Sequence, residues 1–206
     1  LVLDGIETPI ETSHIKATTL YIENSVLFGR VCNSLCSGVG RDAEEPYTIW
    51  IDGVEKKPND TLLVIANPFD LPWNDRRLSS ALFDRMKGLL FEDEELRGEV
   101  EALRQEIDSK LAILEFQLYG DYEFGLEWDL RNYLKAFGFA ASHSAQISLF
   151  DNLISFVNYV SDLSLNLVLI FVNLRTFLSE RELYELQSHI IFLEIESLFL
   201  EGLSTQ

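Results

Sequence analysis

Three short runs of successive apolar residues constrain the fold of this 206-residue chain more than any other feature. The runs span residues 18–22, 61–66 and 165–172. The last two end just before Asn67 and Asn173, and asparagine is a common turn residue. Runs that are apolar on every residue and stop at turn residues are typical of central strands in a parallel sheet, which is covered on both faces. Residues 47–51 and 197–200 are predicted as two further strands.

Helix start and stop signals lie between these runs. Asn24 and Ser25 can cap a helix that Gly38 would end. Ser179 and Glu182 form the S-x-x-E pattern of a capping box, which opens another helix. A strand, a capped helix and a second strand at each end of the chain indicate βα units. The sequence therefore predicts an α/β fold with a mostly parallel sheet.

The middle of the chain has a different pattern, because strand signals nearly vanish between residues 78 and 160. Apolar residues recur every three or four positions across residues 96–118, which predicts an amphipathic helix of roughly six or seven turns that packs on partner helices. Two more helices are predicted at residues 126–137 and 147–160. We therefore expect an α/β head made of residues 1–72 and 163–206, with a helical leg of residues 73–162 inserted between its two halves.

The charge balance first argues against nucleic acid as a partner. The chain has 34 acidic and 16 basic residues and a formal net charge of −18, whereas phosphate binding needs a local excess of lysine and arginine. Net charge does not say where the charges lie. Nucleic-acid binding therefore stays open if the basic residues gather on one surface.

No motif in the chain predicts catalysis. There is no G-x-S-x-G elbow, and His14, His143 and His189 lack the spacing of zinc-binding pairs. The G-x-G at residues 38–40 lacks the G-K-[ST] of a phosphate-binding loop, and it is expected to end a helix rather than to open one. We therefore expect a protein that is not an enzyme.

The remaining composition points to a reducing cytoplasm and away from a membrane. Cys32 and Cys36 match neither a zinc knuckle nor a CxxC redox pair, and are predicted to be small core residues on one helix face. Residues 1–5 lack the positive start of a signal peptide. The most apolar run, residues 163–172, is shorter than the ~20 residues needed to span a bilayer.

A glycine-bearing acidic turn is the strongest candidate for metal binding. Its carboxylates are Glu115, Asp121, Glu123, Glu127 and Asp129. Such hard oxygen ligands on a bendable loop favour calcium or magnesium over zinc, although the order of an EF-hand loop is absent. An ordinary solvated acidic turn is the alternative.

Basic residues next to predicted strand ends are candidates for ligand binding. Lys56 and Lys57 follow the Asp52-Gly53 turn, and Arg175 follows the strand that ends at Val172. Ligands of α/β sheets tend to bind at the carboxyl ends of the strands. The alternative is that these are scattered solubilising charges.

Short segments in a set order resemble the Csn family of type II-A CRISPR-associated adaptation proteins. The segments are residues 19–24, 27–30, 135–138, 169–173, 177–179, 186–187 and 198–201. Each one is short and mostly apolar, and it is their order, their spacing and the helical insertion between them that make the match specific. The resemblance extends from residue 6 to residue 201.

The resemblance implies a fold and a function. Members of this family have a head similar to a P-loop ATPase without a working nucleotide site, together with a helical leg. They form ring-shaped homotetramers stabilised by calcium, and double-stranded DNA ends enter the positively charged channel without sequence readout. They act with the CRISPR adaptation integrase and the effector nuclease during spacer acquisition, and have no known catalytic activity of their own.

The resemblance also implies site residues. Arg30, Lys56, Lys57 and Lys135 match basic positions of the family, and Arg175 is added for its place after a strand. The acidic turn lies where the calcium-binding carboxylates of the family cluster. Two departures are visible: family members usually continue for about one more strand past residue 201, and this chain has few basic residues.

Two functions of other classes remain open on the sequence. One is an acidic protein–protein scaffold that assembles through the helix at residues 96–118 and does not bind DNA. The other is an unusual nucleotide hydrolase built on the same head.

Overall fold

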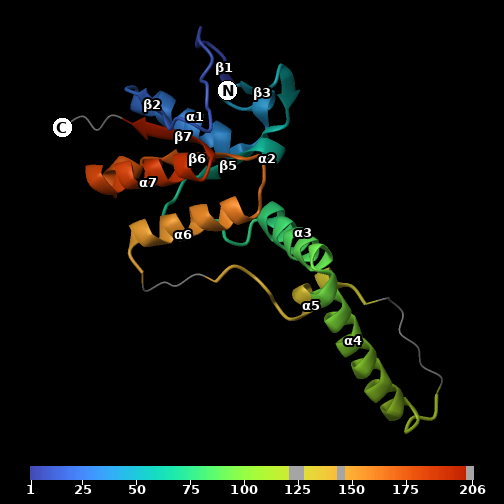
Figure 1. The fold of residues 1–206 in the computed structure, drawn as a ribbon. Coiled ribbons are helices and arrows are strands. Elements are labelled where there is room, and N and C mark those ends of the chain that lie inside the picture. The colour runs from blue at the N-terminus through green and yellow to red at the C-terminus, as the bar shows by residue number, and fades with distance from the viewer. Residues whose placement is uncertain (121–127, 143–146, 203–206) are drawn as a thin grey trace. The chain divides into compact units, whose positions relative to one another are not determined.

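The computed structural model describes residues 1–120, 128–142 and 147–202, and it divides the chain into two compact units (Figure 1). The head unit contains Leu1–Trp73 and Ser142–Gln206, and the leg unit contains Asn74–Ala141. A single insertion between the first and last thirds of the chain therefore interrupts the head.

A four-stranded parallel sheet forms the centre of the head unit. In spatial order its strands are β2 (Thr18–Ile22), β7 (Glu196–Gly202), β6 (Val168–Val172) and β5 (Leu62–Ile65). The pairs β2–β7 and β5–β6 each join a strand from the first part of the chain to one from the last part. The predicted α/β fold with a mostly parallel sheet is confirmed. β6 is buried at every residue, which accounts for its unbroken apolar run.

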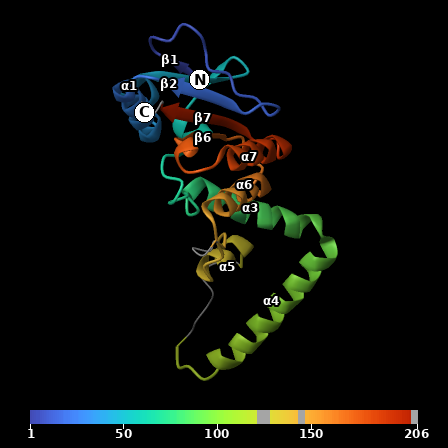
Figure 2. The same cartoon turned by 90° about the vertical axis from the view of Figure 1, so that its left-hand side faces the viewer.

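The helices on the two faces of this sheet begin where the sequence signals lie. α1 (Ser25–Ser37) is N-capped by Asn24, whose side chain accepts the N–H groups of Val26 and Leu27. It ends at Gly38, which has a φ of 67°. α7 (Glu180–Phe192) opens with the predicted capping box. α6 and α7 lie on the face of the sheet away from α1 (Figure 2).

α6 (Leu149–Asp162) belongs to the head unit, whereas the leg was predicted to extend to residue 162. Leu153, Phe156 and Val157 of this helix are fully buried. The ring of Trp73 meets Phe156 edge-on at a centroid distance of 5.1 Å and stacks on Tyr159 at 5.8 Å. Helical periodicity shows that a face is apolar but not which unit covers it, so the boundary was placed too late.

A small antiparallel sheet also belongs to the head unit. Its order is β1 (Val2–Leu3), β3 (Tyr47–Ile51) and β4 (Val54–Lys56). Asp52 and Gly53 join β3 to β4 with φ values of 50° and 74°, as in two-residue hairpin turns. The four-residue helix α2 (Pro58–Thr61) then leads into β5. Two 3-10 turns complete the unit, η1 (Gly40–Asp42) and η2 (Leu174–Thr176).

The two cysteines on α1 differ in burial. Cys32 packs against the core on the α1 side of the sheet, and burial raises the pKa of its thiol to about 11. Cys36 is exposed, so the prediction that both are core residues was wrong for this one. Positions four apart on a helix share a broad face, and the edge of that face reaches solvent here.

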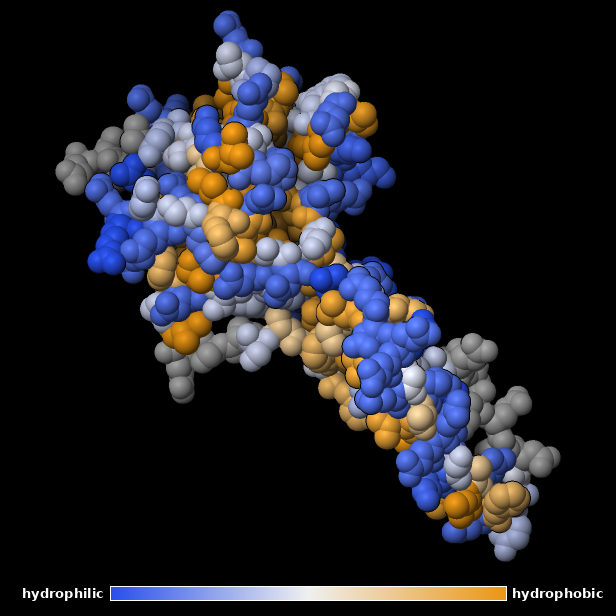
Figure 3. Space-filling model, viewed as in Figure 1, coloured by the Kyte–Doolittle hydropathy of each residue, from blue (hydrophilic) through white to orange (hydrophobic). Residues whose placement is uncertain are grey.

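The leg unit contains α3 (Arg76–Glu92), α4 (Glu94–Glu115) and α5 (Leu130–Ala136). α4 has 22 residues and is N-capped by Asp93, and none of its residues is buried. It ends at Glu115, three residues before the end of the predicted helix at residue 118. Figure 3 shows apolar side chains exposed along this unit.

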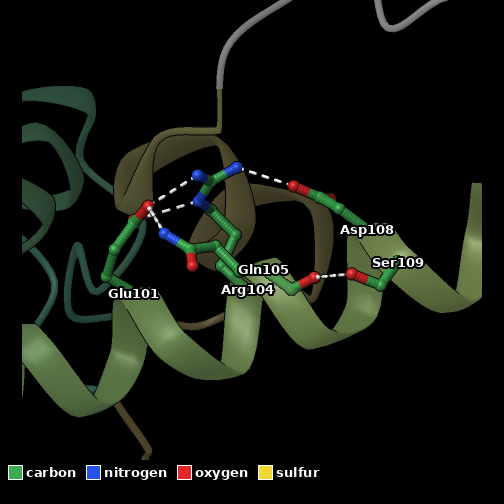
Figure 4. Close-up of polar contacts among 5 residues, drawn as sticks. All are labelled: Glu101, Arg104, Gln105, Asp108 and Ser109. Carbon is green, nitrogen blue, oxygen red and sulfur yellow. Dashed lines mark hydrogen bonds and ion pairs between the residues drawn. The ribbon is translucent and has the colours of Figure 1, made fainter.

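Polar contacts hold the leg helices locally. The Arg131 guanidinium joins α5 to α3 through the Asp84 carboxylate at 2.7 Å and the Ser80 hydroxyl at 2.6 Å. Along α4, Arg104 binds Glu101 on one side and Asp108 on the other (Figure 4). Contacts of this i,i+3 and i,i+4 type favour the helix only slightly, because solvent screens exposed charges.

The assignment of α6 to the head predicts a large stability difference between two phenylalanines. Phe156→Ala should lower the free energy of unfolding of the head by about 3–5 kcal/mol, because it removes a fully buried ring. Phe192→Ala on α7 is the matched control, since that ring is 79% exposed and its loss should change stability by about 0.5 kcal/mol or less. Urea unfolding followed by circular dichroism measures both. Equal small losses would contradict the packing of α6 in the head core.

Candidate nucleic-acid interface

Arg175 lies in η2, directly after β6, and therefore at the carboxyl edge of the parallel sheet. Its guanidinium donates a hydrogen bond to the Tyr21 hydroxyl at 2.6 Å and lies 5.8 Å from the centre of that ring. A Glu180 carboxylate oxygen is 3.7 Å away. The Arg175 side chain is 45% exposed, so it is supported from one side and open to solvent on the other.

A cavity of about 220 Å3 adjoins Arg175 at this edge. Thr19 and Tyr21 of β2 line it together with Phe199 and Glu201 of β7, and α7 closes one side. Tyr21 and Glu201 are direct partners in the β2–β7 register, so parallel pairing brings them to the same place.

Glu201 is unusual among the residues that line this cavity, because glutamate is rarely buried and this one is only 2% exposed. Its Oε1 accepts the Arg175 backbone N–H at 3.4 Å. Burial raises the pKa of Glu201, and the nearby N–H groups and the Arg175 charge offset this only in part. The sequence pattern gave this residue no role. The signal that could have identified it is its place as a lone acidic residue at the end of the apolar run 198–200.

Lys56 and Lys57 lie at the opposite edge of the sheet. Lys56 ends β4, and Lys57 precedes α2, which leads into the start of β5. With strands of four or five residues, the two edges are about 13–17 Å apart. The lysines border cavities of about 460 and 1010 Å3, and neither forms an ion pair within the described residues.

The other predicted basic residues occupy separate places. The Arg30 guanidinium on α1 pairs with Glu45 at 3.0 Å and is 46% exposed. Lys135 is in the last turn of α5, in the leg unit. Within the head unit, Lys56 and Lys57 lie at the edge of the sheet opposite to Arg175, so these predicted DNA-binding residues do not form one basic patch there.

The predicted metal-binding carboxylates are described only in part. Glu115 is the last residue of α4, and Asp129 caps α5 by accepting the Asn132 N–H at 3.3 Å. Asp129 also accepts a hydrogen bond from Lys87 at 3.3 Å. Asp121, Glu123 and Glu127 lie outside the described residues. Among the residues that are described, no group of three or more His, Cys, Asp or Glu side chains could hold a metal ion.

The buried Glu201 predicts a pH dependence of stability. The folded chain keeps a proton on this carboxyl at pH values where the unfolded chain has released it, so folding loses stability as pH rises from the ordinary glutamate pKa through the raised one. Glu201→Gln removes this loss. Urea unfolding from pH 4.5 to 8 should therefore show that the free energy of unfolding of Glu201→Gln increases relative to that of the parent protein as pH rises.

Glu182 supplies a control of opposite sign. The hydroxyl and backbone N–H of Ser179 lower its pKa, so its contribution is present above the ordinary glutamate pKa and is lost as pH falls. With this control measured from pH 3 to 5.5, the free energy of unfolding of Glu182→Gln should fall relative to that of the parent protein as pH rises. A pH-independent difference between Glu201→Gln and the parent would contradict the raised pKa.

No helix among the described residues is long and apolar enough to cross a membrane.

Comparison with known proteins supplies the family. The model of the family described as CRISPR-associated protein (Cas_Csn2) matches residues 43–206. No curated protein matches the chain. Among solved structures, Stu0660 of Streptococcus thermophilus is similar with a TM-score of 0.58 at 15% sequence identity, which shows a shared fold. The similarity covers 93% of this chain but only 64% of that one, so this chain spans less than two thirds of the length of its structural relative. Because the family model covers well over half of the sequence, the chain belongs to the Cas_Csn2 family of CRISPR-associated proteins.

Proposed function

We propose that this protein is a non-catalytic, calcium-stabilised ring that binds the ends of double-stranded DNA during CRISPR spacer acquisition. The observation that carries the proposal is the family match over residues 43–206. The head fold supports it, because the chain shares that fold with Stu0660. The CRISPR adaptation integrase and effector nuclease are the proposed protein partners, and the cytoplasm is the proposed location.

The exposed cations support contact with DNA phosphates. Lys56 and Lys57 have no ion-pair partner among the described residues, and the Arg175 guanidinium has an open side. Lysine and arginine contacts to phosphate give affinity that ignores base sequence and falls with salt. With a net charge of −18, such binding needs the cations to face one channel while the acidic majority faces elsewhere.

The apolar face of α4 supports assembly of several copies. Leu103, Ile107 and Leu111 repeat at four-residue intervals and are 61%, 59% and 41% exposed. A helix that leaves such a stripe open to water is typical of one that packs against another chain. Because one chain spreads its basic residues over separate places, a ring of four copies is the proposed means of bringing them around one channel.

Calcium is proposed to act between acidic subunits. Identical chains of charge −18 repel one another, and a divalent cation held by carboxylates offsets that repulsion. The proposed ligands are Glu115, Asp121, Glu123, Glu127 and Asp129.

The DNA-binding proposal predicts a topology and salt dependence that gel retardation can measure. Linear duplexes should be retained at low salt and closed circular duplexes should not, because only the former offer ends. Lys56→Ala/Lys57→Ala should lower the magnitude of the slope of log affinity against log salt by about two, since each phosphate contact contributes about 0.9. Arg181→Ala is the control, because that arginine pairs with Glu185 on α7. Equal retention of both topologies would overturn end binding.

The calcium proposal predicts a change in mass in solution. Sedimentation of the parent protein should give a tetramer in calcium and smaller species in chelator. Asp121→Asn/Glu123→Gln/Glu127→Gln should give a mass that no longer responds to calcium, because amides hold the ion far less well. Glu95→Gln/Glu99→Gln/Glu106→Gln on α4 is a control with the same charge change and should keep the response. A parent mass that ignores calcium would remove this part of the proposal.

An acidic protein–protein scaffold is the second candidate, and the exposed apolar stripe of α4 favours it equally well. The two candidates differ in the DNA experiment. A scaffold forms its oligomer and retains no duplex at any salt concentration, whereas the proposed ring retains linear duplexes.

A further inference from the structure

The turn that carries Arg175 is tied to the end of a neighbouring strand. β7 extends two residues past its last pairing with β6, so its end reaches the turn between β6 and α7. Three hydrogen bonds join them: the Asn173 N–H to the Leu200 carbonyl at 2.9 Å, the Gly202 N–H to Asn173 Oδ1 at 2.9 Å, and the Arg175 N–H to Glu201 Oε1 at 3.4 Å.

Asn173 has the backbone and the side chain that this junction requires. Its φ of 53° and ψ of 37° lie in the left-handed region, which asparagine adopts more readily than most residues. Its side chain accepts the Gly202 N–H, and a Cβ at Gly202 would approach that same oxygen to 3.5 Å. The hydrogen bond therefore joins the turn directly to the strand end.

The burial of Glu201 costs free energy that an apolar residue at the same position would not cost. Burying a carboxyl group is unfavourable, and an apolar residue would fill the same space without the loss of hydration. What Glu201 gains is an acceptor for the backbone of Arg175 and a place beside Tyr21, its partner on β2. The same two residues thus hold Arg175 at both ends, Glu201 at its main chain and Tyr21 at its guanidinium.

Glu180 does not serve this purpose. Its side chain is 94% exposed and its carboxylate is 3.7 Å from the Arg175 guanidinium. Exposed ion pairs of this kind contribute little to stability, and either partner readily exchanges its contact for another ion.

We propose that Glu201 and Asn173 are positioning residues that hold Arg175 for contact with a DNA phosphate. The proposal rests on the proposed function, in which Arg175 is one of the phosphate-binding residues. An arginine whose main chain and guanidinium are both held loses less freedom when it binds, and its planar group matches two phosphate oxygens. Neither positioning residue touches the DNA itself.

A double-mutant cycle tests the proposal with a blunt linear duplex at low salt. Arg175→Ala should weaken binding by about ten-fold, the effect of one lost charge-assisted contact. Glu201→Ala should weaken binding several-fold in the parent protein and should have no further effect in Arg175→Ala. Glu201→Gln should bind like the parent, because its amide oxygen still accepts the Arg175 N–H. A role in general stability would instead weaken binding equally in both backgrounds.

A second pair of variants keeps the test decisive if Glu201→Ala folds poorly. Asn173→Gly retains the left-handed backbone but lacks the acceptor for Gly202, and Asn173→Asp restores that acceptor. The first should lose several-fold in affinity and the second should regain it. Hydrogen exchange at residues 174–176, measured without DNA, should be faster in Asn173→Gly and Glu201→Ala than in the parent.

The outcomes separate the two proposals. If the parent binds DNA and Arg175→Ala does not weaken it, Arg175 needs no positioning and the inference is wrong while the proposed function stands. Additive losses in the cycle, or unchanged exchange at residues 174–176, likewise overturn the inference alone. If the parent binds no linear duplex at low salt, the proposed function is wrong, and DNA positioning is wrong with it.

Discussion

Parallel pairing of β7 with both β2 and β6 is the constraint on which the rest of the head depends. It joins the first and last parts of the chain across the inserted leg, and it places Tyr21, Glu201 and the turn at Arg175 at one edge of the sheet. Because the β2–β7 pairing closes a loop of more than a hundred residues, its entropy cost is substantial, and the buried side chains of β6 and β7 must offset it. Unfolding of this core would therefore abolish the cavity beside Arg175 as well as the sheet.

The acidic composition becomes informative once the charges are placed. Arg30, Arg41, Arg175 and Arg181 each face a carboxylate, which leaves Lys56 and Lys57 among the cations with no ion pair in the described part of the head. One chain thus presents small, separate basic positions at the two edges of its sheet. Such separate positions are compatible with the proposed phosphate contacts, to which several copies would each contribute.

The structure also separates what the two units supply to the proposed ring. The head unit has a dense core on both faces of its sheet, with buried residues on every strand except β4. The leg unit has an exposed apolar stripe on α4 and paired charges beside it. A well-packed head and an incompletely packed leg are expected of a protein whose leg completes its packing against other copies.

Local patterns in the sequence determined β3 and the strands of the parallel sheet, the cap at Asn24, the capping box at Ser179 and the long helix of the leg, because hydrogen bonding and periodicity within a few residues decide these. They also determined that Arg175 follows a central strand. They did not indicate the short strands β1 and β4. Tertiary structure alone decided that α6 joins the head, that Lys56 and Arg175 lie at opposite edges, and that the Glu201 carboxyl is buried beneath the Arg175 turn. Each of these depends on which distant segment covers a side chain, and no spacing along the chain contains that information.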